Sequence, residues 1–228
     1  MRVTAISDTH CLFPSLPGGD LLVHAGDFSF RGRESEVKPF LRWLEKQLDL
    51  YKHIVFIAGN HEVSFESARG EVAEWMKPYL SDRLVYLEHE EKEVAGLRIF
   101  GSPYTPWFHD WAFNVRRDLL DHVWASIPKE LDLLITHGPP MGIGDFVVER
   151  NWCSALNNWV DEKVHKGDAS LLKALIEKKP RFHVFGHFHD GYGVEVGVGE
   201  LSGVTLINAA QCGEDYKLRE RAAITFEV

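Results

Sequence analysis

The sequence has few of the features that mark secreted, membrane-spanning or structural-zinc proteins. Its 228 residues include only three cysteines, at positions 11, 153 and 212, and no Cys-x-x-Cys pair. This odd, scattered set excludes a disulfide framework and a zinc knuckle, and it indicates free thiols in a reducing compartment. No apolar run approaches the ~18 residues of a membrane-spanning helix, and no signal-peptide core follows Met1. We therefore expect a cytoplasmic protein without a membrane partner.

Positive charge is also scarce. Lys and Arg number 25 against 34 Asp and Glu, so the net charge is −9. Proteins that follow the phosphates of DNA or RNA usually carry a basic surplus, so we expect no long nucleic acid as a partner. An anionic ligand would need a local source of positive charge. The 12 histidines stand out against this background.

The hydrophobic content, 45%, predicts a packed core, and the length suits one domain over residues 1–228. Short runs rich in Val, Ile, Leu and Phe alternate with amphipathic stretches, which indicates a layered α/β protein whose strands are buried by helices on both faces. The predicted strands are Val3–Ile6, Leu21–Ala25, His53–Ala58, Leu84–Leu87, Leu97–Phe100, Leu131–Thr136, Phe182–Phe185, Val204–Asn208 and Ala222–Phe226.

Helical spacing of apolar residues predicts the remaining elements. A helix over Glu34–Leu50 has Pro39 in its first turn, and Asp168 caps another helix. The charged run Glu88–Glu93 indicates a solvated hairpin loop. Residues 141–167 are the candidate for a small cap, to which Trp152 and Trp159 contribute unless they form an oligomer contact. Weaker helices are predicted over Glu66–Met76 and Arg117–Ala125, and a β-hairpin over Gly191–Gly203.

Polar residues recur at one place, directly after the apolar strands. In open α/β sheets, ligand sites collect beyond the carboxyl ends of the strands, and the glycines beside these residues let the backbone approach a ligand. We therefore expect the five strand ends to build one site. Their sequences are Ser7-Asp8-Thr9-His10, Gly26-Asp27, Gly59-Asn60-His61-Glu62, Thr136-His137-Gly138-Pro139-Pro140 and Gly186-His187-Phe188-His189.

The side chains at these ends offer oxygen and imidazole ligands and no thiolate. This set suits Mn²⁺ best, with Fe, Zn²⁺, Co²⁺ or Ni²⁺ as alternatives. The seven candidates exceed the needs of one ion and fit two ions that share a carboxylate. Two ions ~3.5–4 Å apart clamp a phosphoryl group for in-line displacement and lower the pKa of a bridging water. The candidate ligands are Asp8, His10, Asp27, Asn60, His137, His187 and His189.

In order and spacing, these motifs resemble the signature of the calcineurin-like metallophosphoesterases from residue 8 to residue 189. The resemblance implies a four-layer αββα sandwich with a two-metal site at its edge. It also implies a role for each position. Asp8, His10 and His189 would hold the first ion, Asn60, His137 and His187 the second, Asp27 would bridge them, and His61 would lie near the substrate phosphate and the leaving oxygen.

A narrower resemblance links the chain to metallophosphoesterase-domain-containing proteins. It is carried by the segments around Asp8, Asp27 and His137 and by Gly101-Ser102-Pro103-Tyr104-Thr105-Pro106-Trp107. That subgroup is associated with slow hydrolysis of cyclic nucleotides. Some of its animal members carry Gly at the place of His187, so the histidine here implies an intact second metal site.

The sequence thus predicts a metal-dependent phosphodiesterase of small, nucleotide-like substrates, with cyclic nucleotides as candidates. A hydroxide between the ions would attack phosphorus, with Asp27 and His61 as catalytic residues. A phosphomonoesterase and a non-catalytic scaffold protein of the same fold are the alternatives. The sequence leaves the metal, the oligomeric state and the physiological substrate open.

Three further features carry weaker predictions. The aromatic stretch from Ser102 to Phe113 either stacks a nucleobase, with Trp107 as the candidate, or fills the core. Arg117 is a candidate for binding the substrate phosphate. Cys11 lies near the site in sequence, and its role is open. His24 and His183 sit within apolar strands, which indicates buried core histidines.

Overall fold

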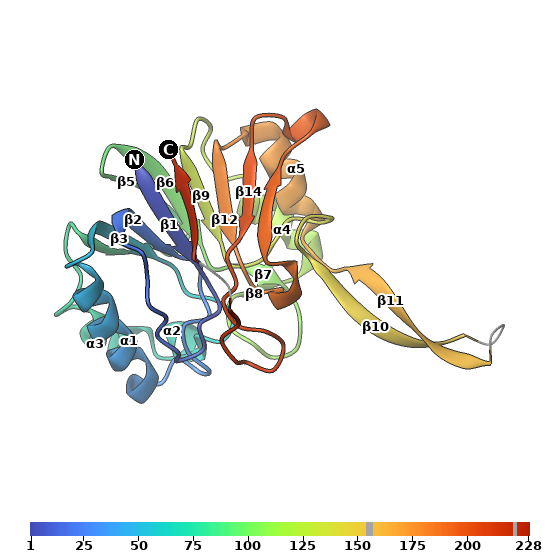
Figure 1. The fold of residues 1–228 in the computed structure, drawn as a ribbon, viewed down its shortest axis with the longest axis horizontal. Helices are drawn as coiled ribbons and strands as arrows, with labels where there is room; N and C mark the ends of the chain where they lie inside the picture. Colours follow the sequence, from blue (N-terminus) through green and yellow to red (C-terminus); the bar gives the residue numbers. More distant parts are fainter. Residues whose placement is uncertain (154–156, 221–222) are drawn as a thin grey trace.

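Two β-sheets packed face to face form the centre of the molecule (Figure 1). The structure, a computed structural model, describes residues 1–153, 157–220 and 223–228. In the first sheet the order is β15-β1-β2-β3-β4, and all neighbours are parallel except β15. Its strands are β1 (Arg2–Ile6), β2 (Gly19–His24), β3 (Tyr51–Phe56), β4 (Leu84–Tyr86) and β15 (Ile224–Glu227).

The second sheet has the order β13-β14-β12-β9-β6-β5. Its four inner strands are parallel, and the edge strands β13 and β5 are antiparallel to their neighbours. The glycine-rich segment Gly191–Gly203 supplies only one strand of the predicted hairpin, β13, because its partner β14 begins at Thr205. The strands are β5 (Glu90–Val94), β6 (Leu97–Ser102), β9 (Leu133–Thr136), β12 (Phe182–Phe185), β13 (Gly193–Val196) and β14 (Thr205–Asn208).

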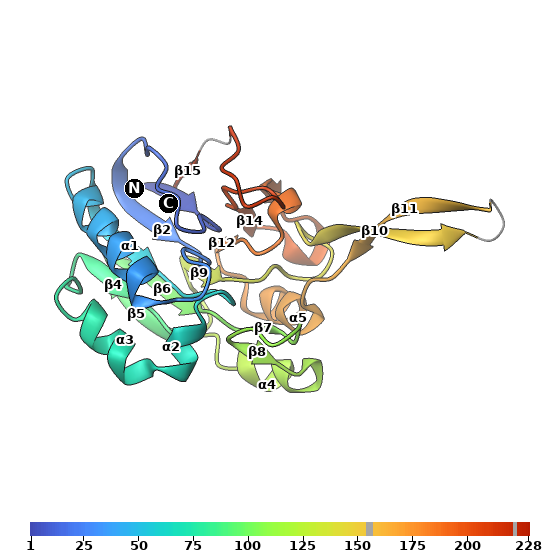
Figure 2. The ribbon, with the colours of Figure 1, turned by 90° about the horizontal axis from the view of Figure 1, so that it is seen from below.

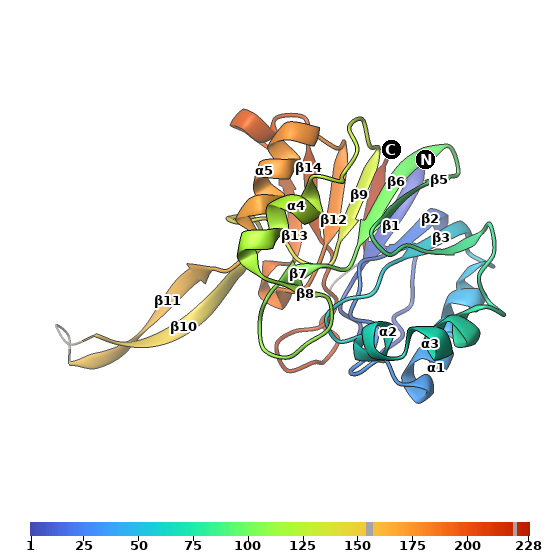
Figure 3. The ribbon, with the colours of Figure 1, turned by 180° about the vertical axis from the view of Figure 1, so that it is seen from behind.

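Helices cover the outer face of each sheet, which confirms the four-layer αββα sandwich (Figure 3). Side chains alternate along β2, where Leu21 and Val23 pack between the sheets and Leu22 packs under α1. Helices therefore bury one face of each sheet, and the other face is buried by the second sheet. The prediction of helices on both faces was wrong in this respect. The helices are α1 (Glu34–Gln47), α2 (Val63–Ser67) and α3 (Arg69–Met76) on the first sheet, and α4 (Leu120–Trp124) and α5 (Ala169–Lys178) on the second.

Several sequence-based boundaries were wrong for identifiable reasons. Pro39 lies at the sixth position of α1 rather than in its first turn. The charged run is not a loop, because it forms the exposed edge strand β5, where both faces tolerate charge. The helix predicted over Glu66–Met76 breaks at Ala68, which has φ −135°. Ala222, the first residue of one predicted strand, lies outside the described residues.

Residues 141–167, the candidate cap, form mainly a two-stranded arm that projects from the sandwich (Figures 1 and 2). The arm pairs β10 (Phe146–Cys153) with β11 (Asn158–His165) in antiparallel register, and Trp152 lies opposite Trp159. Buried Asp145 holds its root, because the carboxylate accepts from the N–H groups of Gly142 and Gly167. No helix in the described part of the chain has the length and apolar character needed to cross a membrane.

Candidate metal centre

The carboxyl ends of β1, β2 and β3 in one sheet meet those of β9 and β12 in the other. Backbone hydrogen bonds join the segments that follow these strands: Asp8 N donates to Gly26 O at 3.0 Å, and Gly186 N donates to His137 O at 2.9 Å. All seven candidate ligands gather here in two adjoining groups. The sequence therefore placed these side chains together correctly, and whether they bind ions stays a prediction.

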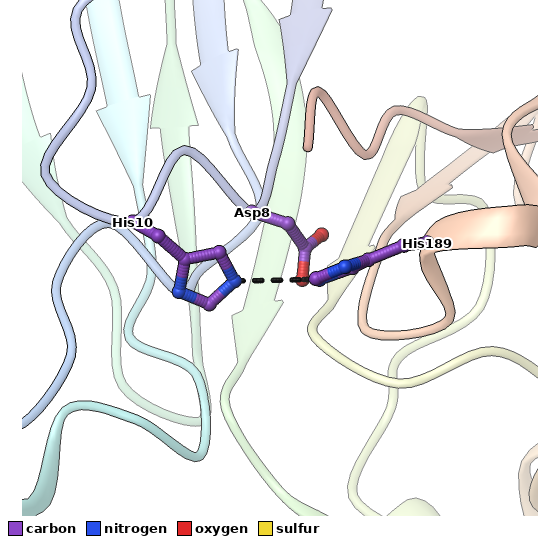
Figure 4. Close-up of side chains that lie close together, drawn as sticks. All are labelled: Asp8, His10 and His189. Carbon is purple, nitrogen blue, oxygen red and sulfur yellow. Dashed lines mark hydrogen bonds and ion pairs between the residues drawn. The ribbon is translucent and has the colours of Figure 1, made fainter. Parts of the chain in front are cut away.

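The first group contains Asp8 and His10 from the end of β1 and His189 from the segment after β12 (Figure 4). The Nε2 atoms of the two imidazoles are 3.3 Å apart, and Asp8 Oδ1 lies 3.4 Å from His189 Nε2. Each Nδ1 faces a backbone carbonyl, that of Ser29 for His10 and that of Gly213 for His189. A carbonyl only accepts, so Nδ1 carries a proton and Nε2 is the ring atom that faces the centre.

The second group contains Asp27, His137 and His187, with Asn60 beside them. His137 Nε2 lies 3.2 Å from Asp27 Oδ2 and 2.9 Å from Asn60 Oδ1. The ring is oriented like those of the first group, because His137 Nδ1 donates to the carbonyl of Ala25 at 2.9 Å. This group therefore presents one carboxylate, one amide oxygen and two imidazoles.

Asp27 connects the two groups. Besides the second group, it belongs to a cluster with His10 and His61 whose ligand atoms all lie within 4.8 Å of one another. The N–H of His61 donates to Asp27 Oδ1 at 2.9 Å, while His61 Nδ1 faces the carbonyl of Phe30 at 3.1 Å. Asp27 therefore lies close to members of both groups, and the Nε2 of His61 is left facing the site.

The charges of these groups fit cation binding. Burial opposes ionisation of Asp8 and Asp27, but nearby histidines, chiefly His189 and His137 respectively, outweigh it and lower the pKa of both acids. Burial lowers the pKa of His187 to about 3 and that of His10 to about 4. Both carboxylates are thus charged and these two rings neutral near pH 7, which is the form that binds a metal.

Burial also opposes the charging of His137 and His189, but the carboxylates beside them outweigh it. Asp27 is the main partner of His137 and Asp8 of His189, and each pKa rises to about 9. Without a bound cation, each of these two rings is protonated near pH 7, His137 beside Asp27 and His189 beside Asp8. A bound metal ion would take the place of that proton, so ion uptake and proton release are coupled.

The backbone at the site adopts an uncommon conformation. Four candidate ligands have positive φ, at 52° for Asp8, 41° for His10, 54° for Asp27 and 68° for His187. Such angles cost a non-glycine residue free energy and concentrate at functional sites. The backbone at Gly186 also packs closely against Asp8, because a Cβ at this position would overlap Asp8 Oδ2.

Glu62 is the main site residue to which the sequence analysis gave no role. Its side chain is fully buried, and its carboxylate accepts from the N–H groups of Asp27, Ser29 and Gly59 and from the hydroxyl of Ser29. Burial, and then the charge of Asp27, raise the pKa of Glu62 to about 8 although these donors favour its charged form. An acid directly after Gly-Asn-His is the signal that could have identified it.

Two aromatic rings also escaped prediction. Trp111 packs against His61 with a centroid distance of 4.3 Å, and Arg31 lies 4.2 Å over the indole. Tyr216, far along the chain, packs edge-on against His10 with a centroid distance of 4.7 Å. Nothing in the local sequence of Tyr216 indicates this proximity.

The aromatic stretch is divided between the core and the surface, and stacking of a nucleobase stays a prediction. Phe113 is fully buried in the core, whereas Trp107 is 58% exposed and lines a cavity of about 480 Å³ beside His187. Arg117 lines the same cavity, and its guanidinium donates to the carbonyls of Lys166 and Gly167. Cys11 is partly buried, which raises the pKa of its thiol to about 11 and makes it a poor metal ligand at neutral pH.

His24 and His183 are buried core histidines, as predicted. His24 Nε2 lies 3.0 Å from the hydroxyl of Thr9, and His183 Nε2 lies 2.8 Å from that of Thr136. Both threonines neighbour candidate ligands in the chain, so the two rings support the site from behind.

The donor set agrees with two divalent ions. Carboxylate, amide and imidazole ligands with no thiolate suit Mn²⁺, Fe, Co²⁺, Ni²⁺ or Zn²⁺, and the two groups, with Asp27 close to members of both, offer two places. The Nδ1 hydrogen bonds fix three of the rings before any ion arrives. Such fixed rings are typical of metal-binding histidines.

Comparisons with known proteins agree with this geometry. The profile of the family described as calcineurin-like phosphoesterase matches residues 1–191. The chain is 36% identical over 241 residues to human metallophosphoesterase domain-containing protein 1, covering 95% of this chain and 68% of the human protein. It is also 36% identical over 236 residues to UPF0046 protein C25E10.12 of Caenorhabditis elegans, covering 96% and 77%.

Solved structures share the fold at low sequence identity. The crystal structure of TT1561 of Thermus thermophilus aligns over 91% of this chain and 88% of its own, with a TM-score of 0.59 and 12% identity. Another crystal structure aligns over 91% of this chain and 89% of its own, with a TM-score of 0.63 and 16% identity. These likenesses concern the sandwich alone.

Proposed function

Because this chain belongs to the calcineurin-like phosphoesterase family, we propose that it is a phosphodiesterase that hydrolyses small nucleotide-like substrates with two divalent ions. The observation that carries the proposal is the position of Asp27 between two groups of ligand atoms. Asp8, His10 and His189 would hold one ion, and Asn60, His137 and His187 the other. We propose Mn²⁺ as the metal, because all donors are oxygen or imidazole nitrogen.

Two divalent ions, when bound, supply a nucleophile at neutral pH and neutralise the charge of the phosphoryl oxygens. The protein's contribution beyond the ligands is the placement of His61. The carbonyl of Phe30 holds its Nδ1 proton, so Nε2 faces the site, 3.9 Å from Asp27 Oδ2. In its charged form, His61 donates from Nε2 to the phosphate or to the leaving oxygen.

The surroundings of His61 favour this role. The ring is 8% exposed and sandwiched between Trp111 and the edge of His10. Such packing fixes the ring plane and excludes bulk water, which strengthens a hydrogen bond to a phosphate. His61 is therefore the proposed proton donor.

We propose a diester as the substrate, in place of a monoester, because a cavity of about 480 Å³ lies beside His187. This volume lies in the range of small-molecule sites and has room for an organic substituent on the phosphate. The cavity walls are mostly apolar, so they offer little to a second free phosphate oxygen.

The test is a measurement of bound metal followed by an assay of esters. The protein reconstituted with Mn²⁺ should bind two ions per chain and hydrolyse bis-p-nitrophenyl phosphate and cyclic nucleotides faster than p-nitrophenyl phosphate. Faster turnover of the monoester would favour a phosphomonoesterase. Two bound ions with no turnover of any ester would favour a non-catalytic scaffold.

Asp27→Ala provides the matched test of the shared ligand. This variant should lose bound metal and turnover together, whereas Asp49→Ala, an exposed control, should keep both. Full turnover in Asp27→Ala would contradict the bridging role.

A further inference from the structure

The cavity beside His187 is bounded by the arm as well as by the sandwich. Trp107 and Phe108, from the segment between β7 (Thr105–Pro106) and β8 (Asn114–Val115), form one part of its lining. Val147 and Glu149 of β10 contribute another part, together with Lys166 directly after β11. The root of the arm is therefore part of a ligand-sized space that opens next to a candidate metal ligand.

Strand geometry explains which arm residues reach the cavity. Val147 and Glu149 are two positions apart, so they lie on the same face of β10. Val148, between them, points to the opposite face and is 55% exposed. Only one face of the arm root is therefore available to a ligand in the cavity.

Two polar side chains of the lining form an ion pair. Lys166 Nζ lies 2.6 Å from Glu149 Oε1, with both side chains partly exposed. Arg117 holds the backbone that carries Lys166, because Nη2 donates to the carbonyl of Lys166 at 3.0 Å and Nη1 to that of Gly167 at 3.1 Å. A hydrogen-bond acceptor and a donor are thus held side by side at the edge of an aromatic space.

We propose that this cavity binds a nucleobase of the substrate, and that Glu149 and Lys166 contact its edge. An exposed indole at Trp107 suits stacking with a planar ring. A neighbouring carboxylate and ammonium suit a ring edge that carries both a donor and an acceptor, which nucleobases provide. This inference rests on the proposed function for the position of the phosphate, and it assigns specificity to the arm.

Arg117 has a structural role in this arrangement. Two of its guanidinium nitrogens donate to backbone carbonyls, so it serves as a positioning residue for the segment that carries Lys166, and binding of the phosphate by Arg117 stays a prediction. Glu149, Lys166 and Trp107 are the residues that contact the base.

The experiment compares two diesters that share the p-nitrophenol leaving group. One is the p-nitrophenyl ester of a nucleoside 5′-monophosphate, prepared with each of the four RNA bases, and the other is methyl p-nitrophenyl phosphate. The wild-type protein with Mn²⁺ should show a kcat/KM at least tenfold higher for the nucleoside esters. Trp107→Ala should raise KM for them by roughly tenfold and thereby remove most of their advantage over the methyl ester.

Glu149→Gln should reduce the differences in KM among the four bases, with kcat little affected. Two exposed arm residues on the other face of the arm serve as controls. Trp152→Ala removes a tryptophan that is 52% exposed, and Asp161→Asn alters an exposed acid that lies opposite Arg150 in the register. Both controls should retain wild-type KM values.

A binding measurement separates this inference from the proposed function. A plain nucleoside lacks the phosphate, so its saturation-transfer NMR signal with metal-free protein reports on the cavity alone. The signal should weaken in Trp107→Ala and persist in Trp152→Ala. Diester hydrolysis with equal kcat/KM for the methyl and nucleoside esters would overturn the inference and leave the proposed function standing. Nucleoside binding without hydrolysis of any diester would do the reverse.

Loss of affinity for all four bases by the same factor in Glu149→Gln would overturn the edge contact specifically. Stacking by Trp107 would then account for the affinity alone.

Discussion

The backbone N–H of Asp27 donates to Glu62 Oε2 at 2.9 Å, so a second buried acid holds the residue that links the two ligand groups. The same carboxylate binds the N–H groups of Ser29 and Gly59. Glu62 therefore fastens the loop after β2 to the loop after β3. The position of Asp27 depends on a residue that is not among the candidate ligands.

Glu62→Gln should destabilise the fold and lower metal occupancy. The amide directs an N–H₂ group at backbone donors, which leaves at least one buried donor unsatisfied at a cost of about 1–3 kcal/mol. Urea denaturation and metal analysis would measure both effects. Glu45→Gln, on the exposed face of α1, is the control and should change neither. An unchanged unfolding free energy in Glu62→Gln would contradict this role.

His61→Gln should separate metal binding from turnover. The variant keeps all seven candidate ligands, so two Mn²⁺ ions should remain bound while kcat falls by about 10²–10⁴-fold through loss of the proton donor. The exposed control His122→Gln should keep wild-type kcat. Loss of metal in His61→Gln would instead make His61 a ligand.

Gly186→Ala should disturb the first ligand group. The added methyl would overlap Asp8 Oδ2 and Ser7 Oγ, and overpacking of a buried site costs about 1–3 kcal/mol. Gly70→Ala is the control and should not destabilise the protein, because Gly70 lies in α3 with nothing within 4 Å of a new Cβ. It should stabilise the protein by about 0.5–1 kcal/mol. Equal melting temperatures for the two variants would disprove the steric argument.

His183 should make the protein less stable in acid. Burial lowers its folded pKa to about 3, against about 6.5 in the unfolded chain. Between these values the unfolded chain binds the extra proton, so the unfolding free energy falls as the pH drops from 6.5 towards 3. The slope from this one residue is at most about 1.4 kcal/mol per pH unit.

His183→Gln removes that proton site while keeping a donor for Thr136. Thr136 gives its own proton to the carbonyl of Gly138 at 2.7 Å, so His183 must donate from Nε2. Denaturation of metal-free protein at several pH values between 4 and 7 should show a shallower loss of stability in the variant. Parallel profiles for variant and wild type would refute the assignment.

The sequence predicted the inner strands and the seven converging side chains because both signals are local. Each buried strand is a short apolar run, and each candidate ligand follows such a run directly, as Asp8 follows Ile6 within two residues. In parallel sheets the chain direction then brings these ends to one edge. The position of Asp27 beside two groups follows from the same rule.

The same local signals could not predict contacts between segments that are far apart in the sequence. The strands of the arm carry alternately exposed charges and aromatics, such as Glu149 and Trp152, without a buried face that would mark a strand. Tyr216 contacts His10 because of the path of a C-terminal loop. The spacing of apolar and polar residues does not predict the path of such a loop. Arg117 was identified as a site residue, but its carbonyl partners depend on the packing of the arm root.

The left-handed angles at Asp8, His10, Asp27 and His187 have a consequence for engineering. Copying the seven side chains onto another scaffold would not recreate this centre, because ordinary strand-to-helix connections do not supply those backbone conformations. Conversely, a natural relative that kept these connections and lost a single imidazole could regain the complete set of donors by one substitution. The connections, more than the side chains, are the part of this centre that is difficult to rebuild.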